Sequence, residues 1–341
     1  MSGERIGGPV SGRWVIPASL ALLAVMAVLP AFIPPFFVGN IFGRAIVFGI
    51  IAMSLTFLAT YGGFTSLAQM MLAGIAGYVV AILVPGAVPS IVGGVPYAVA
   101  IPIGLLAATA MGLLVGAIAV RTQGIYLLMI TLALAVGMHL FIQANITWFN
   151  GYEGIRNVVG PELFGVPFRN TYLFYYLSLA TAALLYAGVL YLVRTPFGLV
   201  LQGIRDNARR VNALGYQAPL HRIAAFGIGG FIAGCGGLLA TFYNIGISPG
   251  TIGLGPTVNV LVMAVIGGLG HPIGAFLGAL IFVVFDTFAA DFYDRERFNT
   301  LIGAVFLAIV LLSPDGVLGL AKRLGGAFRR APQPRAAPAG E

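Results

Sequence analysis

Apolar stretches separated by short polar segments run along almost the whole chain. Many reach about 20 residues, the length that an α-helix needs to cross roughly 30 Å of hydrocarbon. We therefore predict an all-α fold, a polytopic transmembrane helical bundle of about ten spans. The predicted spans are residues 14–36, 41–60, 64–84, 97–120, 125–148, 172–193, 223–243, 258–269, 273–290 and 298–312.

The eighth of these stretches is shorter than the others and runs into a glycine-rich segment that includes Gly267 and Gly268. It can be a full crossing, a half-helix or a re-entrant segment. Broken helices expose backbone groups, which are tolerated only against protein or a watery cavity, and transport sites often use such breaks. Together with the polar Ser248 before it, this region is therefore a candidate substrate path.

Most of the 18 basic residues fall on one side of this topology when the amino terminus is placed inside. Because cytoplasmic loops carry an excess of Lys and Arg, we expect both termini to be cytoplasmic. Residues 1–13 would then form a cytoplasmic amino terminus, residues 14–320 the membrane domain, and the proline-rich residues 321–341 a disordered cytoplasmic tail.

Composition agrees with a surface that faces lipid. Only 8% of the 341 residues are charged and 59% are hydrophobic, whereas a soluble domain carries about 25% charged residues. The net charge of +8 follows from the topology bias, so it does not indicate a nucleic-acid partner. Glycines and alanines recur every four residues along 97–120, from Ala100 to Gly116, which predicts close helix packing within the chain or at a subunit interface.

The densest charge lies in the loop at residues 194–222. Apolar residues recur at helical spacing over residues 197–214 and charged ones, from Arg205 to Arg210, take the opposite face. Gly215 is expected to end this helix in a left-handed turn, and Asp206 to pair with Arg209 or Arg210. Periodicity alone leaves two readings open, a lipid anchor in the membrane interface and a docking helix for a cytoplasmic partner.

Few side chains carry candidate chemistry. His139 and Gln143 lie one turn apart inside the fifth span, as a functional pair or an interhelical hydrogen bond. Asp286 is expected at the solvated outer end of the ninth span. Three histidines and one cysteine predict no metal site, and the only lysine, Lys322, lies in no phosphate-binding loop, so ATP cannot bind by that motif.

Three segments resemble the permeases of branched-chain amino acid ABC importers, over roughly residues 50–320, in an order closer to the LivM-type subunit. They are YGGFTSLAQMMLAGIAGY from Tyr61, the segment from Arg121 to Ala133, and the stretch from Arg194 to Ala279 that contains GIRDN and ALGY. The sequence departs from the family pattern at Gln69–Met71, at Ala208 and Arg209, and at Asn259.

The resemblance implies a bacterial inner-membrane permease subunit that is not an enzyme and needs no cofactor. Its partners would be a homologous permease subunit, two cytoplasmic ABC ATPase subunits and an extracytoplasmic solute-binding protein, with a hydrophobic or neutral amino acid as cargo. The residues that would couple to the ATPase are Gly203, Arg205, Asp206, Asn207, Ala213, Leu214 and Gly215. The candidate substrate path comprises Gly63, Ser66, His139, Gln143, Ser248, Gly267 and Gly268.

Three other functions remain to be weighed. Permeases for urea or short-chain amides share the same motifs. An ion-coupled secondary transporter would need carboxylates near mid-depth, and apart from Asp286 the spans carry none. An intramembrane enzyme would need a catalytic constellation within the spans, such as a serine in a G-x-S-x-G setting with a partner histidine. The one match to that pattern, GISPG at residues 246–250, lies between two predicted spans rather than within one.

Overall fold

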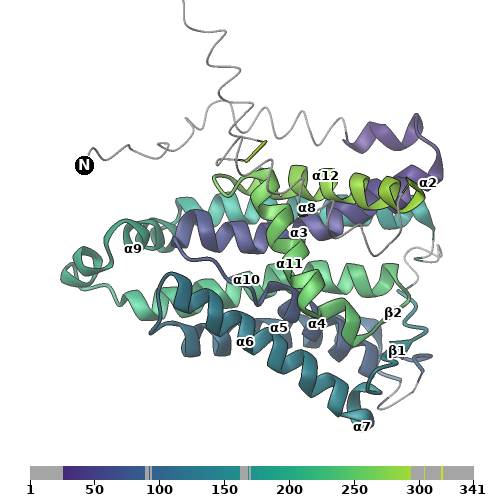
Figure 1. Ribbon diagram of the computed structural model, residues 1–341, viewed down its shortest axis with the longest axis horizontal. Coiled ribbons are helices and arrows are strands. Elements are labelled where there is room, and N and C mark those ends of the chain that lie inside the picture. Colours follow the sequence, from purple (N-terminus) through teal and green to yellow (C-terminus); the bar gives the residue numbers. More distant parts are fainter. Residues whose placement is uncertain are drawn as a thin grey trace, which may run out of the picture.

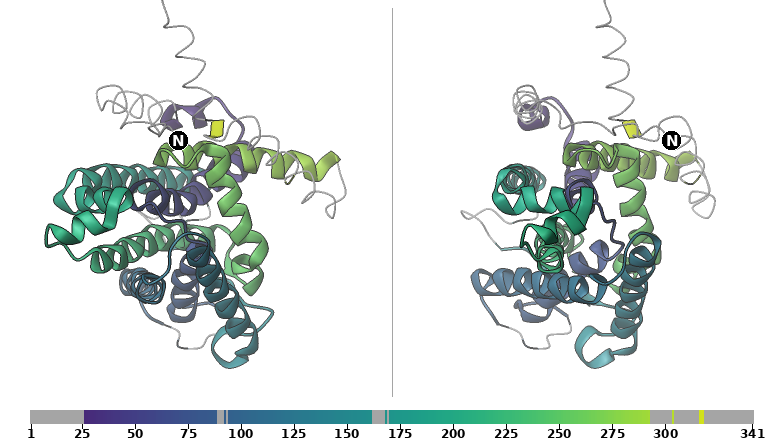
Figure 2. Two further views of the ribbon diagram at one scale, coloured as in Figure 1. Left: turned by 60° about the vertical axis from the view of Figure 1, so that its left-hand side comes forward. Right: turned by 90° about the vertical axis from the view of Figure 1, so that its left-hand side faces the viewer.

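The computed structural model is a helical bundle, described over residues 26–88, 92, 94–161, 168, 170–292, 303 and 316–317. Helices α3, α8 and α12 lie on one side of it, helices α4, α5, α6 and α10 lie on the other, and α11 crosses between them (Figures 1 and 2). The helices are α2 (Pro35–Phe37), α3 (Arg44–Phe57), α4 (Gln69–Leu83), α5 (Tyr97–Ala119), α6 (Ile125–Ala144), α7 (Ile146–Phe149), α8 (Thr171–Arg194), α9 (Pro196–Ala213), α10 (Ala218–Tyr243), α11 (Leu254–Gly267) and α12 (Pro272–Phe292).

Each of the second to ninth predicted spans overlaps one of these helices. Among the described residues, six helical stretches are long and apolar enough to cross a membrane, and α4 and residues Pro272–Phe288 of α12 are shorter apolar helices. The bundle is therefore that of an all-α, multi-pass protein. The amino-terminal segment 1–13, most of the first span, the tenth span apart from residue 303, and the tail 321–341 lie outside the described residues.

The third predicted span begins later than expected. Gly63 adopts a left-handed φ of 73°, and residues 64–68 form no helix before α4 begins at Gln69. Side chains satisfy this irregular backbone, because Leu67 N–H donates to Thr131 Oγ1 (3.1 Å) and Ala68 N–H donates to Ser66 Oγ (3.2 Å). Such backbone is tolerated at membrane depth when protein surrounds it.

The face of α5 that carries the small residues packs against other helices of the same chain. Ala100, Gly104, Ala108, Gly112 and Gly116 are all buried. A β-carbon at Gly112 would lie 2.6 Å from the carbonyl oxygen of Phe226 in α10, so the two backbones approach as closely as glycine permits. Of the two readings of this face, intrachain packing is therefore correct.

The two ends of the bundle differ. One end carries α9, and we call it the α9 end. At the opposite end, β1 (Ile155–Arg156) pairs antiparallel with β2 (Gly246–Ile247), and Val88 forms a bridge to Arg156. This end, which we call the β end, thus ties three loops together by a small sheet that the sequence did not predict (Figure 1).

Candidate functional site

Helix α9 is not the single straight helix that its periodicity predicts. Asn207 has a non-helical φ of −161° and ψ of 96°, which breaks α9 into two limbs. Its side-chain oxygen accepts a hydrogen bond from the backbone N–H of Arg210 (3.1 Å), so Asn207 caps the second limb. Asparagine is among the strongest N-cap residues because its side chain replaces a missing backbone partner, and this local bond outweighs helix continuation.

The apolar face of α9 packs against its own second limb. Val200, Ile204, Val211 and Ala218 form a separate buried cluster, with Ala208 packed against it. Gly203 permits the fold, since a β-carbon there would lie 3.0 Å from Val211 Cγ2. The side chains of this cluster are therefore not available to lipid, and the outward surface of α9 carries the charged residues together with Leu199, which is 60% exposed.

The turn after α9 has the left-handed conformation that the sequence predicts. Gly215 has a left-handed φ of 89°. The Tyr216 N–H donates to the Val211 carbonyl oxygen (3.3 Å) and the Gly215 N–H donates to that of Asn212 (3.0 Å), which is the hydrogen-bond pattern of a Schellman motif. Ala213 and Leu214, just before the turn, are exposed, with Leu214 77% exposed.

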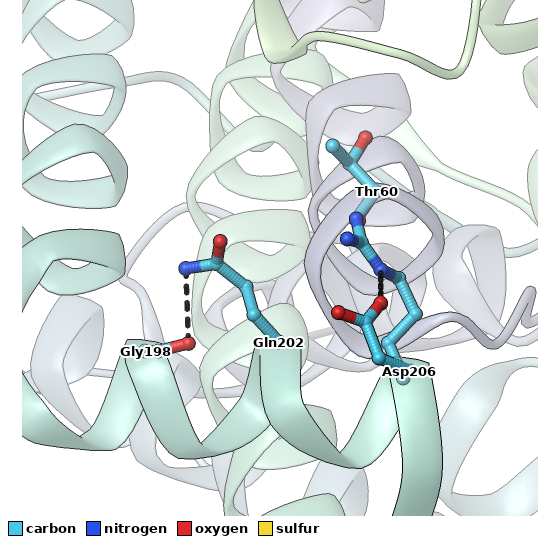
Figure 3. Close-up of polar contacts among 5 residues, drawn as sticks. Thr60, Gly198, Gln202 and Asp206 are labelled. Carbon is cyan, nitrogen blue, oxygen red and sulfur yellow. Dashed lines mark hydrogen bonds and ion pairs between the residues drawn. The ribbon is translucent and has the colours of Figure 1, made fainter. Parts of the chain in front are cut away.

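Arg205 points into the bundle rather than outward from α9. Its Nε contacts Asp206 Oδ1 (3.1 Å), and its Nη1 donates to the carbonyl oxygen of Thr60 (2.6 Å) (Figure 3). The predicted pairing of Asp206 with Arg209 or Arg210 is therefore wrong, because the break at Asn207 turns the second limb away from helical register. Gln202 Nε2 also donates to the carbonyl oxygen of Gly198, within α9 (Figure 3). It donates to that of Val193 as well, which fastens α9 to the end of α8.

A chain of hydrogen bonds continues from Arg205 toward α11. Thr60 lies in the π-helical segment Leu58–Gly62 that ends α3, and its hydroxyl donates to the carbonyl oxygen of Leu269, just after α11. Gly63 lies directly under the Arg205 side chain, where any β-carbon would collide with it. Helix α9 is thus joined to the ends of α3 and α11.

A cavity of about 270 Å³ borders this junction. It lies between the end of α3, the α5–α6 turn, α9 and the start of α10, and its lining includes Gly63, Gln123, Asp206, Asn207 and Arg222. Three of the predicted coupling residues, Arg205, Asp206 and Asn207, therefore line this cavity at the α9 end.

A larger cavity, about 730 Å³, lies between α3, α4, α10, α11 and α12. Two polar pairs stand in its wall. Arg44 Nη1 is 2.8 Å from Asp286 Oδ2, and Tyr243 Oη donates to Asn40 Oδ1 (2.8 Å). Pockets for small molecules typically measure about 300–1,000 Å³ and combine apolar walls with a few polar groups, so this cavity fits a small solute.

The seven predicted path residues lie in different places. Ser248 lines the large cavity. His139 Nδ1 donates to the carbonyl oxygen of Pro249 (3.0 Å), so it holds the short helix Pro249–Ile252, which borders the cavity, while Gln143 lies half-buried farther along α6. Ser66 and Gly63 stabilise the irregular segment before α4. Gly267 and Gly268 pack against other glycines, with Gly267 meeting Gly274 of α12 and Gly268 meeting Gly316.

Sequence reasoning missed Arg44 as a cavity residue and placed Asp286 at a solvated helix end. In the structure the Asp286 side chain is 24% exposed and paired with Arg44. The available signal was a lone arginine and a lone aspartate at matching depths of the second and ninth spans. Among the described residues, no three His, Cys, Asp or Glu side chains gather closely enough to hold a metal ion.

Comparisons with known proteins match this architecture to one family. Residues 37–310 match the family model described as the branched-chain amino acid transport system permease component. The chain is 25% identical to the high-affinity branched-chain amino acid permease protein LivM of Escherichia coli K12, over 67% of this chain and 59% of LivM. The chain thus spans about three fifths of the length of that relative.

Two further relatives match a comparable share of the chain. The chain is 28% identical to a probable branched-chain amino acid permease protein LivM of Methanocaldococcus jannaschii, over 63% of this chain and 67% of that protein. It is 31% identical to the autoinducer 2 import permease protein LsrC of Klebsiella pneumoniae, over 63% of this chain and 61% of LsrC. No solved structure matches it.

Proposed function

The chain belongs to the branched-chain amino acid transport system permease family, and on this premise we propose that it is a permease subunit of an ATP-driven importer for branched-chain or other neutral amino acids. The observation that carries the proposal is the continuous contact from α9, through Arg205 and Thr60, to α3 and α11, two helices that line the large cavity. A movement imposed on α9 would reach the walls of that cavity.

The α9 end is proposed to face the cytoplasm. Arg121, Arg194, Arg205, Arg209 and Arg210 lie at this end, in loops or helix ends, and an excess of basic residues marks cytoplasmic loops. The β end, with the sheet that closes three loops, would then face the outside and receive cargo from a solute-binding protein.

The energy for transport is proposed to come from other chains. Two ABC ATPase subunits would dock on the cytoplasmic loops, with the exposed surface of α9 as this chain's docking surface, and a homologous permease subunit would complete the pathway in the bacterial inner membrane. Binding of ATP would move α9, and the junction at Thr60 would shift α3 and α11 to open the cavity to one side or the other. This is alternating access, with no covalent chemistry in the chain.

Docking is expected to depend on the arginines that point outward. The side chains of Arg209 and Arg210 are exposed and form no hydrogen bond or ion pair with another described residue. Changing both to glutamine should lower recovery of the ATPase in a pull-down from membranes, with normal membrane yield. The matched control is Arg121→Gln, at the same end but outside α9. Equal ATPase recovery from both variants would remove α9 from the docking surface.

The topology gives a separate expectation. Tyr152, 79% exposed at the β end, and Leu214, 77% exposed after α9, are placed on opposite sides of the membrane. In a Cys235→Ala background, Tyr152→Cys should react with an impermeant thiol reagent added outside whole cells. Leu214→Cys should react only after permeabilisation. Labelling of both cysteines from the same side would contradict the proposed orientation.

One alternative has specific support. An ion-coupled transporter would require a carboxylate within the bundle, and Asp286 lies in the cavity wall paired with Arg44. The energy source of transport therefore distinguishes the two functions, since an importer of this family needs ATPase partners and an ion-coupled carrier does not.

A further inference from the structure

The large cavity has charged groups at one end and an apolar wall at the other. Arg44 is the first residue of α3 and lies toward the β end, and Asp286 lies at the same depth of α12. Val47 and Ile51 follow Arg44 by one and two helical turns, so they line the cavity about 5 and 10 Å deeper.

Apolar side chains also line the cavity on α12, α11 and α4. Phe282 lies one turn deeper in α12 than Asp286, and Met263 of α11 and Met70 of α4 line the cavity as well. Tyr243, bonded to Asn40, ends α10 beside the charged pair. The cavity therefore has its charged groups toward the β end, and its deeper wall is mainly apolar, with Thr241 and Asn259 as polar residues in it.

We propose that this cavity binds the zwitterion of an aliphatic α-amino acid, with Arg44 holding the carboxylate and Asp286 the ammonium group, and with the aliphatic side chain between Val47, Ile51 and Phe282. This inference rests on the proposed import function and assigns the residues that would grip the cargo within the membrane.

The pair suits this role because its two charges already neutralise each other. The Arg44 and Asp286 side chains are 37% and 24% exposed, so each has lost part of its hydration, and a partner of opposite charge offsets that cost. An incoming zwitterion replaces one ion pair by two, so neither Arg44 nor Asp286 loses a partner when the pair opens. A solute that carries only one of the two charges would leave either the arginine or the aspartate unpaired, and it should be rejected.

Protection of a cysteine in the cavity tests the proposal directly, in membranes that contain the full chain. Ser248 lines the cavity, and Ser248→Cys in a Cys235→Ala background is modified with a small methanethiosulfonate reagent. Leucine should slow the modification. Leucinamide, which lacks the carboxylate, and 4-methylpentanoate, which lacks the amine, should need concentrations at least about tenfold higher, which corresponds to about 1.4 kcal/mol.

Variants of the pair separate binding from a structural role. Arg44→Gln and Asp286→Asn should each abolish protection by leucine, whereas Arg156→Gln, an exposed arginine at the same end, should retain it. The double variant Arg44→Gln with Asp286→Asn leaves no unpaired charge, so a purely structural pair predicts that this variant recovers membrane yield and leucine protection together. The proposed site predicts recovery of yield without recovery of protection.

The possible failures are distinct. Leucine protection that survives in the double variant would overturn the assignment of Arg44 and Asp286 while leaving the import function standing. Protection by urea in place of leucine would overturn the zwitterion site and favour a permease for small amides. Leucine protection in a chain whose assembled transporter does not accumulate leucine with ATP would refute the import function alone and support the site.

Discussion

Replacing Gly112 by valine is expected to prevent the protein from accumulating in a folded form. A β-carbon at this position would lie 2.6 Å from the carbonyl oxygen of Phe226 and 3.2 Å from the Cα atoms of Gly227 and Gly230. All three are backbone atoms of α10, so no side chain can rotate away, and α5 must separate from α10. Overpacking of a close contact costs about 1–3 kcal/mol and occasionally more.

The measurement is the yield of monodisperse protein after detergent extraction. Gly137→Val is the matched control, because Gly137 is an exposed glycine in the middle of α6 with no atom within 4 Å of an added β-carbon. We expect a near-complete loss of yield for the α5 variant and a small change for the α6 variant. Equal yields would show that the approach of α5 to α10 is not required for folding.

Replacing Arg205 by methionine is expected to uncouple ATP hydrolysis from transport. The variant removes the hydrogen bond to Thr60 and the ion pair with Asp206 while it keeps an unbranched side chain over Gly63. Because the Arg205 side chain is 41% exposed, solvent screening keeps the loss of stability small. Loss of the link to α3 should lower ATP-driven uptake by at least about tenfold, equivalent to about 1.4 kcal/mol of coupling.

The contrast with the outward arginines makes this result specific. The Arg205→Met variant should recover the ATPase normally in a pull-down and hydrolyse ATP, because its side chain points into the bundle. The variant with both Arg209 and Arg210 changed should lose ATPase recovery itself. If Arg205→Met instead lost the ATPase, the residue would belong to the docking surface that its periodicity first suggested.

The features that follow local rules were predictable from the sequence. Hydropathy located eight helices because each must satisfy its own backbone in lipid, whatever its neighbours. Small residues spaced every four along α5 predicted close packing, and the glycine at position 215 predicted a left-handed helix end. The family resemblance was confirmed by a model that spans residues 37–310.

The predictions that failed concern hydrogen bonds for which a side chain competes with the helix, or contacts between residues distant in the sequence. Periodicity does not show that the Asn207 side chain would capture a backbone N–H and break α9. Nor does it show that the apolar face of α9 would be covered by its own second limb. The ion pair of Arg44 with Asp286 joins two helices more than 200 residues apart in the sequence, so only their packing brings the charges together.

The most direct test of the account is the energy source of transport. The chain would be reconstituted in vesicles with the ATPases, second permease and binding protein encoded by the genes beside it, and accumulation of labelled leucine would be followed. The account predicts accumulation that requires ATP and both ATPase subunits and that is insensitive to collapse of ion gradients. Accumulation by the chain alone, driven by a proton or sodium gradient with no ATPase present, would contradict it.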